Sequence, residues 1–282
     1  MGKLALAAKI THVPSMYLSE HDGPHKGCRQ AAIDGHHEIS RRCRELDVDT
    51  IVVFDTHWLV NSGYHINCAA AFEGIYTSNE LPHFIKNLPY SYPGNTELGQ
   101  LLADEATRQG VHTRAHGQTS LTLEYGTLVP MRYMNADKRF KVVSVSALCT
   151  VHSLADSECL GAAMRHAIET QYDGRVAVLA SGSLSHRFAQ NGVSEQYLHK
   201  IWDPFLEQMD RRVIELWQNA QWATFMDMLP MYADKCHGEG FMHDTAMLMG
   251  ILGGARYDKP VEVITPYFAS SGTGQINAIF PV

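Results

Sequence analysis

A run of apolar, mostly β-branched residues at 49–57, DTIVVFDTH, constrains the fold of this chain most strongly. Polar residues bound the run on both sides, which is typical of a central strand buried on both faces of a sheet. Further strand patterns occur at 3–10, 139–147, 175–181 and 260–265, and helical patterns at about 28–46, 95–110, 156–171, 197–218 and 241–252. Strands that alternate with helices predict an α/β fold with a mostly parallel central sheet and helices on both faces.

The domain organisation follows from what is absent between these patterns. No fixed-period repeat and no low-complexity linker divides the 282 residues, so we expect a single catalytic domain over residues 1–282. The segment from about 60 to 94 is rich in aromatic, proline and asparagine residues. We expect it to be a long irregular insertion of the kind that often carries function.

Charge and cysteine content exclude several classes of protein. The formal net charge is −7 and the basic residues form no run, so neither nucleic acid nor a membrane surface is an expected partner. No window offers the roughly 18 apolar residues that a membrane helix needs. The six cysteines form no C-x-x-C pair, and together these features predict a cytoplasmic protein with free thiols.

Three histidines follow predicted strands directly or closely. His12 comes after the strand 3–10, His57 ends the run 49–57, and His186 lies a few residues beyond the strand 175–181. In open α/β sheets, ligands bind outside the carboxyl ends of the strands. A single histidine after a strand is more often an ordinary loop or capping residue, but His12 and His57 together favour a metal site.

Two neutral imidazoles need a carboxylate to complete the two-histidine, one-carboxylate site that marks non-haem Fe(II) oxygenases. The segment 236–247, CHGEGFMHDTAM, offers acidic and imidazole candidates. Glu239 stands between two glycines, which let a backbone approach a crowded centre. Asp244, His237 and His243 lie nearby, and the residue types alone do not choose among these four.

Longer motifs supply that choice. The chain resembles the class III extradiol ring-cleaving dioxygenases of the protocatechuate 4,5-dioxygenase β-subunit superfamily, and within it the branch that cleaves homoprotocatechuate. The resemblance covers nearly the whole chain. It is carried by LALAAKITHVPSM (4–16), DTIVVFDTHWLVNSGYHINC (49–68), YTSNELPHF (76–84), LEYGTLVPMRYMN (123–135), KVVSVSALCTVH (141–152), VLASGSLSHRF (178–188), GEGFMHDTAML (238–248) and SSGTGQINAIFP (270–281).

The resemblance implies roles for five residues. His12, His57 and Glu239 would bind Fe(II), with Mn(II) as the alternative because both ions accept the same nitrogen and oxygen ligands. His186 would be the acid/base beside the substrate. Many members carry a second catalytic histidine where this chain has Tyr125. A phenol there can donate a hydrogen bond and, if its pKa is lowered, shuttle a proton.

The same resemblance implies a substrate. Two imidazoles, one carboxylate and a dication sum to a positive site, which favours deprotonation of a bound catechol. The implied reaction opens 3,4-dihydroxyphenylacetate with O2 between carbons 2 and 3, giving 5-carboxymethyl-2-hydroxymuconate semialdehyde. The candidates for binding the substrate carboxylate are Arg187, His152, Ser270, Ser271 and Thr273.

Three other functions stay open at this point. The first is a dioxygenase for a different catechol, such as 2,3-dihydroxyphenylpropionate. The second is a non-catalytic binding module on the same fold, against which His186 argues because a binding module needs no spare acid/base. The third is a metal-dependent hydrolase. Metal analysis would distinguish it from a dioxygenase, since zinc has no redox activity and cannot support the oxygen chemistry. The family commonly assembles, so a homo-oligomer is expected.

Overall fold

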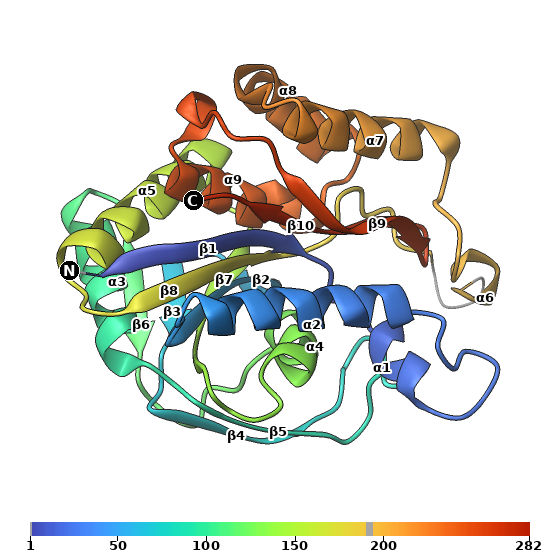
Figure 1. Cartoon of the computed structure of the whole chain (residues 1–282), viewed down its shortest axis with the longest axis horizontal. Helices are drawn as coiled ribbons and strands as arrows, with labels where there is room; N and C mark the ends of the chain where they lie inside the picture. Colours follow the sequence, from blue (N-terminus) through green and yellow to red (C-terminus); the bar gives the residue numbers. More distant parts are fainter. Residues whose placement is uncertain (1, 190–193) are drawn as a thin grey trace.

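The structure is a computed structural model that describes residues 2–189 and 194–282. An eight-stranded sheet runs through it in the order β6-β3-β7-β2-β8-β1-β10-β9 (Figure 1). Its centre consists of parallel neighbours that are buried over most of their length, as predicted for apolar runs of this kind. These central strands are β7 (Lys141–Cys149), β2 (Thr50–Val60), β8 (Arg175–Ser181) and β1 (Lys3–Ile10).

The outer strands introduce antiparallel pairs. β10 (Thr273–Phe280) pairs antiparallel with both β1 and β9 (Glu262–Ser270). At the other edge, β3 (Tyr64–Asn67) is antiparallel to β7 and parallel to β6 (Thr113–His116). The prediction of a mostly parallel α/β sheet is therefore confirmed.

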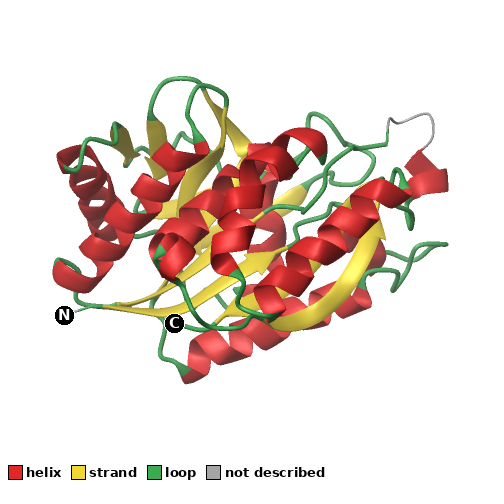
Figure 2. Cartoon of the chain, turned by 90° about the horizontal axis from the view of Figure 1, so that it is seen from above, coloured by secondary structure: helices red, strands yellow, loops and turns green. Residues whose placement is uncertain are grey.

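Helices cover both faces of this sheet, as predicted (Figures 1 and 2). One face carries α2 (Gln30–Glu45) and α4 (Tyr125–Met134), whose apolar residues join one core cluster. A second core cluster includes apolar residues of α3 (Thr96–Arg108), α5 (Leu154–Thr170), α7 (Pro204–Gln218), α8 (Trp222–Lys235) and α9 (His243–Leu252). Among the described helices, none combines the length and apolar character that crossing a membrane requires.

Three expectations about elements were wrong. The segment 60–94 is not irregular, because it contains β3 and a separate hairpin. The hairpin consists of β4 (Ala71–Tyr76) and β5 (Leu88–Pro93). The helix expected at 197–218 begins only at Pro204, where the side chain of Asp203 accepts from two backbone N–H groups and caps α7. The single last strand expected at 260–265 is a hairpin of β9 and β10.

The polar residues of β10 explain why it was missed. Gln275 and Asn277 interrupt any apolar run, yet both are fully buried and hydrogen-bonded within the fold. Helix α4 was missed for a related reason, since it contains Pro130, a residue that normally argues against a helix interior.

Strand order decides where the site forms. β8 lies between β1 and β2, and Ser181 at its end pairs with Ile10 on one side and Asp55 on the other. His12 and His57 each lie two residues beyond these partners. The sheet therefore brings the two histidines to the same edge, on either side of the end of β8.

Candidate metal centre and substrate pocket

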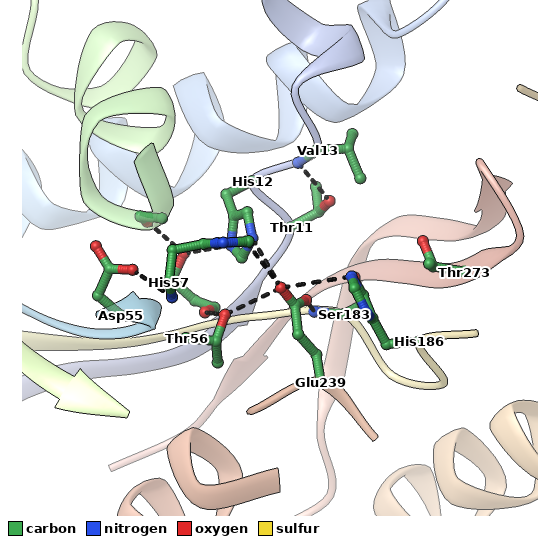
Figure 3. Close-up of polar contacts among 12 residues, drawn as sticks. Thr11, His12, Val13, Asp55, Thr56, His57, Ser183, His186, Glu239 and Thr273 are labelled. Atoms are coloured by element: carbon green, nitrogen blue, oxygen red, sulfur yellow. Dashed lines mark hydrogen bonds and ion pairs between the residues drawn. The ribbon is translucent and has the colours of Figure 1, made fainter. Parts of the chain in front are cut away.

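Two imidazoles converge on one carboxylate oxygen at this edge (Figure 3). The Nε2 atoms of His12 and His57 each lie 3.1 Å from Oε1 of Glu239. The ligand atoms of the three residues all lie within 4.8 Å of one another, a spacing that one metal ion can bridge. These are the residues that the resemblance selected.

A short 3-10 turn, η2 (Glu239–Met242), delivers the carboxylate to the centre. Gly238 forms an antiparallel bridge with Ser185, and Glu239 donates its N–H to the carbonyl of Leu184 at 3.2 Å. Gly240 has φ of 55°, and a Cβ there would come within 2.8 Å of the carbonyl oxygen of Ala147. Glycine is therefore required at 240 by both backbone conformation and space.

The other candidates of the segment 236–247 are engaged elsewhere. Asp244 is fully buried and forms an ion pair with Lys9. His243 shares a hydrogen bond of 2.7 Å with Ser157 through Nδ1. His237 is exposed and contributes its backbone carbonyl to the N–H of His186. Glu239 alone of the four belongs to the group that can hold a metal among the described residues.

Ser181 sets the tautomer of His12. The Ser181 hydroxyl donates to the carbonyl oxygen of Gly126 at 2.5 Å, so it has no hydrogen left for the imidazole. His12 Nδ1, 2.9 Å from Oγ of Ser181, is therefore the donor in that contact. This leaves Nε2 of His12 without a proton and with its lone pair directed at the centre, the state that a metal ligand needs.

The charge of the centre fits a cation. Burial opposes a charge on Glu239, yet His12 and His186, when they are protonated, hold its pKa well below the usual value. Burial also disfavours protonated His57, but its hydrogen bond to Glu239 outweighs this and raises the pKa. The lone pair of His12 Nε2 faces an anionic oxygen at 3.1 Å, an arrangement that a bound dication resolves.

His186 lies beside this centre rather than in it. Its Nε2 is 3.7 Å from Oε1 of Glu239, beyond hydrogen-bond distance, and its backbone bridges to Thr273 of β10. Burial, together with the neighbouring imidazoles of His57 and His12, lowers its pKa even though Glu239 opposes the shift. His186 is therefore a neutral imidazole at pH 7, able to accept a proton.

Tyr125 opens α4 and lies flat against a metal ligand. Its ring centroid is 3.7 Å from that of His57 and 5.6 Å from that of His12. Burial raises the pKa of Tyr125 well above its usual value, and the nearby charge of Glu239 adds to this shift. The shift runs opposite to the lowered pKa that proton shuttling would need, so the phenol is suited to donating a hydrogen bond.

A cavity of about 520 Å³ opens onto these groups. Besides the three ligand residues, His186 and Tyr125, it is lined by Ser15, Ser270, Ser271, Thr273 and Phe188, among others. Three of the residues expected to bind the substrate carboxylate, Ser270, Ser271 and Thr273, thus lie at the pocket.

The two cationic candidates do not lie there. Arg187 is half exposed, places its guanidinium 4.7 Å from the ring centroid of Trp202, and faces Asp203. His152 stacks on Tyr64 with ring centroids 4.2 Å apart. Neither lines the cavity. Arg187 follows His186 in the sequence and His152 follows β7, but a position in the sequence does not fix the direction of a side chain in the folded protein. We therefore withdraw both as substrate ligands.

Sequence reasoning missed several residues that support the centre. The hydroxyl of Thr56 donates to the carbonyl of Ser181 at 3.0 Å and lies 3.1 Å from Oε1 of Glu239. The backbone N–H of Ser183 donates to Oε2 of Glu239. Their only signal in the sequence was position, since Thr56 directly precedes His57 and Ser183 lies three residues before His186.

Comparisons with known proteins agree with this geometry. A family model described as the catalytic LigB subunit of aromatic ring-opening dioxygenase matches residues 6–281. The chain belongs to this family. His12, His57 and Glu239 together form a His/His/Glu group of the kind that is typical of the metal site of these dioxygenases.

Two curated relatives and one solved structure are similar to this chain. It is 64% identical over 271 residues, 96% of its length and 98% of the relative's, to the 3,4-dihydroxyphenylacetate 2,3-dioxygenase of Escherichia coli. It is 25% identical over 205 residues, 69% of its length and 66% of the relative's, to the 2-aminophenol 1,6-dioxygenase beta subunit of a Pseudomonas species. An uncharacterized Escherichia coli K12 protein shares the fold, with a TM-score of 0.65, 13% identity, and coverage of 98% of this chain and 99% of that one.

Proposed function

We propose that this protein opens the ring of 3,4-dihydroxyphenylacetate with O2 between carbons 2 and 3, forming 5-carboxymethyl-2-hydroxymuconate semialdehyde. One observation carries the proposal: a relative that is 64% identical over nearly the full length of both chains bears that activity in its name. The pocket supports it, because an aromatic-sized cavity opens onto the His12–His57–Glu239 group.

We propose Fe(II) as the resident metal, with Mn(II) as the alternative. Two imidazole nitrogens and a carboxylate oxygen suit either ion and leave coordination positions open on one face. When bound, such an ion supplies a Lewis acid for the catechol oxygens and a redox link between the catechol and O2. Zinc satisfies the same ligands but supplies no redox chemistry.

The residues beside the metal ligands would then divide the proton chemistry. His186, neutral at pH 7 because its pKa is lowered, would take a proton from a catechol hydroxyl and later return it to oxygen. Tyr125, whose pKa is raised, would keep its proton and orient the substrate by donating a hydrogen bond. Ser271 and Thr273, which line the cavity, would contact the side chain of the substrate.

Anaerobic reconstitution with Fe(II), followed by 3,4-dihydroxyphenylacetate and air, tests the function. The expected result is prompt yellow colour and stoichiometric O2 uptake, with none from protein reconstituted with Zn(II). Uptake with 2,3-dihydroxyphenylpropionate but not with 3,4-dihydroxyphenylacetate would move the substrate assignment. No uptake with any catechol would remove the dioxygenase assignment.

We further propose that residues 1–282 form a single catalytic domain that acts as a homo-oligomer in the cytoplasm. The support is the family match over residues 6–281 and the prevalence of symmetric assemblies among soluble enzymes. Size-exclusion chromatography with light scattering gives the subunit number directly, and a mass equal to one chain would contradict the homo-oligomer.

A further inference from the structure

Arg29 is a buried cation directly behind the pocket wall. It precedes α2 and is only 4% exposed. Its Nε donates to Oγ of Ser15 at 2.8 Å, and one terminal nitrogen donates to Oγ of Ser270 at 3.0 Å. Both serines line the cavity that opens onto the metal centre. The guanidinium is thus one hydroxyl group away from the space that a substrate would fill.

Among the described residues, no carboxylate neutralises this guanidinium. The remaining partners are the carbonyl oxygens of Leu198 and Ala269 and Nδ1 of His199, and the ring of Phe268 lies 5.2 Å away. Within the part of the chain that the structure describes, no Asp or Glu comes within ion-pair distance of Arg29. A buried arginine without a counter-ion is unusual, because burial of an unpaired charge is unfavourable.

The charge persists despite its burial. Burial lowers the pKa of Arg29 to about 10, which still leaves the group protonated at neutral pH. Among the described residues that line the cavity there is no lysine or arginine, and two are glutamates, Glu80 and Glu239. Arg29 is therefore the cation that can offset a negatively charged substrate at this end of the pocket.

The hydroxyls of the two serines carry the influence of the Arg29 charge into the pocket as hydrogen-bond donors. Each accepts an N–H from Arg29, so each keeps its own hydroxyl hydrogen. Their Oγ atoms are 3.3 Å apart, so one hydroxyl can donate to the other while the second donates into the pocket. A hydroxyl that accepts a hydrogen bond from a fixed cation is a strong donor to a carboxylate, and more so where little water is present.

We propose that Arg29, acting through Ser15 and Ser270, makes this pocket selective for catechols that carry a carboxylate side chain. The proposal rests on the ring-opening function proposed above and names the group that would recognise the anionic end of the substrate. Arg29 is a positioning residue in this scheme, because the serine hydroxyls and not the guanidinium face the ligand.

The test compares a carboxylated and a neutral catechol in matched variants. For Arg29→Gln, kcat/KM for 3,4-dihydroxyphenylacetate should fall roughly 10- to 100-fold, mainly through KM, while 4-methylcatechol changes little. Ser15→Ala should show the same pattern more weakly. Arg44→Gln is the control, since Arg44 lies on the same helix with its guanidinium also 5.2 Å from an aromatic ring, Phe140, but pairs with Asp137 away from the pocket.

A binding measurement separates this proposal from the proposed function. Calorimetric titration with 4-hydroxyphenylacetate and 4-methylphenol, which undergo no ring opening, should show that Arg29→Gln weakens only the first. If both ligands weaken alike, or both catechols lose kcat/KM alike, Arg29 is merely structural and the proposal is wrong. If wild-type protein opens neutral catechols as well as carboxylated ones, selectivity is refuted while ring opening stands. If it opens no catechol, the proposed function fails, and the titration still decides the role of Arg29. Should Arg29→Gln not fold, Ser15→Ala and Arg29→Lys carry the same comparison.

Discussion

At the scale of single residues, a difference of 0.6 Å in the distance to Glu239 separates two kinds of histidine. His12 and His57 place Nε2 at 3.1 Å from Oε1 of Glu239, whereas His186 stands at 3.7 Å. The shorter pair is close enough to share an ion with the carboxylate, and the longer contact keeps His186 outside that group, as the proposed role in proton exchange requires. The same carboxylate receives the N–H of Ser183 on its other oxygen, so its orientation is fixed before any metal binds.

Removal of the carboxylate should remove the metal. Glu239→Ala deletes the only anionic ligand in the described group, so stoichiometric Fe(II) binding should be lost, as measured by metal analysis after desalting. His237→Asn is the matched control, because the exposed His237 side chain lies two residues away and outside the group. A Glu239→Ala protein that kept a full equivalent of iron would show that Asp244 or another group is the ligand.

His186 should be separable from metal binding. His186→Gln keeps the shape and one polar end of the side chain but cannot exchange protons near neutrality. We expect unchanged iron content and a fall in kcat of roughly 10²- to 10⁴-fold, the range for loss of a general acid/base. Oxygen-uptake kinetics and metal analysis on the same sample provide the two readings. Normal turnover with full iron would contradict the role of His186.

At the scale of elements, helix α9 links the metal turn to the rest of the fold. It follows η2 directly and packs closely on α5 through glycines from both helices. A Cβ on Gly161 of α5 would lie 2.0 Å from the carbonyl oxygen of Met247, and one on Gly250 of α9 would lie 2.0 Å from that of Glu158. The two backbones are in contact, so neither helix can shift without moving the other.

Gly161→Ala tests this contact. Alanine favours a helix over glycine by about 1 kcal/mol, yet here the added methyl group meets backbone that cannot give way. We expect a net loss of about 2 kcal/mol in the free energy of unfolding, measured by urea titration. Gly117→Ala is the control, since a Cβ there meets only Thr96 at 3.8 Å. Unchanged or greater stability of Gly161→Ala would mean that the helices adjust.

Helix α7 is hydrogen-bonded to the loop that carries His186 through the buried side chain of Asp210. Asp210 accepts from the N–H and hydroxyl of Ser185, at 3.1 and 2.8 Å, and from the hydroxyls of Tyr232 and Tyr267. Burial nevertheless raises its pKa from 3.8 to about 6. A raised pKa means that the folded protein favours protonated Asp210. The stabilising contribution is then full below pH 4 and is lost as the pH rises through 6.

Asp210→Asn should therefore alter the pH dependence of stability. The wild-type protein should lose about 3 kcal/mol relative to the variant between pH 4 and pH 7, because only the wild type must ionise a buried carboxyl. Urea unfolding at a series of pH values gives the difference curve. The Gly117→Ala protein, which changes no titratable group, serves as the reference for general pH effects, and a flat difference curve would contradict the assignment.

At the scale of the whole molecule, the site is formed by segments that lie far apart in the sequence. His12 follows β1, His57 lies within β2 just beyond its pairing with β8, and Glu239 opens the turn before α9; β8 lies between the two strands. The sheet and its two apolar clusters are extensive without any ion. Metal should therefore stabilise the folded chain without being required for folding.

Thermal unfolding tests this whole-molecule statement. At a free metal concentration of about 100 Kd, binding contributes about 2.7 kcal/mol, which should raise Tm by roughly 5–10 °C for a chain of this size. Circular dichroism of chelated and Mn(II)-loaded protein measures the shift anaerobically or in air. His12→Ala should show the low Tm in both conditions. Loss of all structure on chelation would contradict the expectation of a folded apo-protein.

The sequence by itself determined the fold class, the central strands and the two metal-binding histidines. Apolar strand runs and helical periodicity are local patterns, and strand ends share one edge of a parallel sheet, so β1, β2 and β8 could be located and His12 placed beyond β1. His57, expected to end its strand, lies inside β2, which continues to Val60, but it still lies just beyond the pairing of β2 with β8. Glu239 was one of four candidates until the family motif selected it.

Only the tertiary structure decided which side chains share the pocket. Arg187 and His152 are close in sequence to site residues yet point elsewhere, while Ser15 and Ser270, 255 positions apart, meet at 3.3 Å. Arg29 gave no signal in sequence, because burial without a counter-ion depends on every neighbouring segment at once. The buried polar strand β10 was hidden for the same reason, since its hydrogen-bond partners lie on distant elements. Local periodicity records which face of an element is apolar, and only packing decides what that face meets.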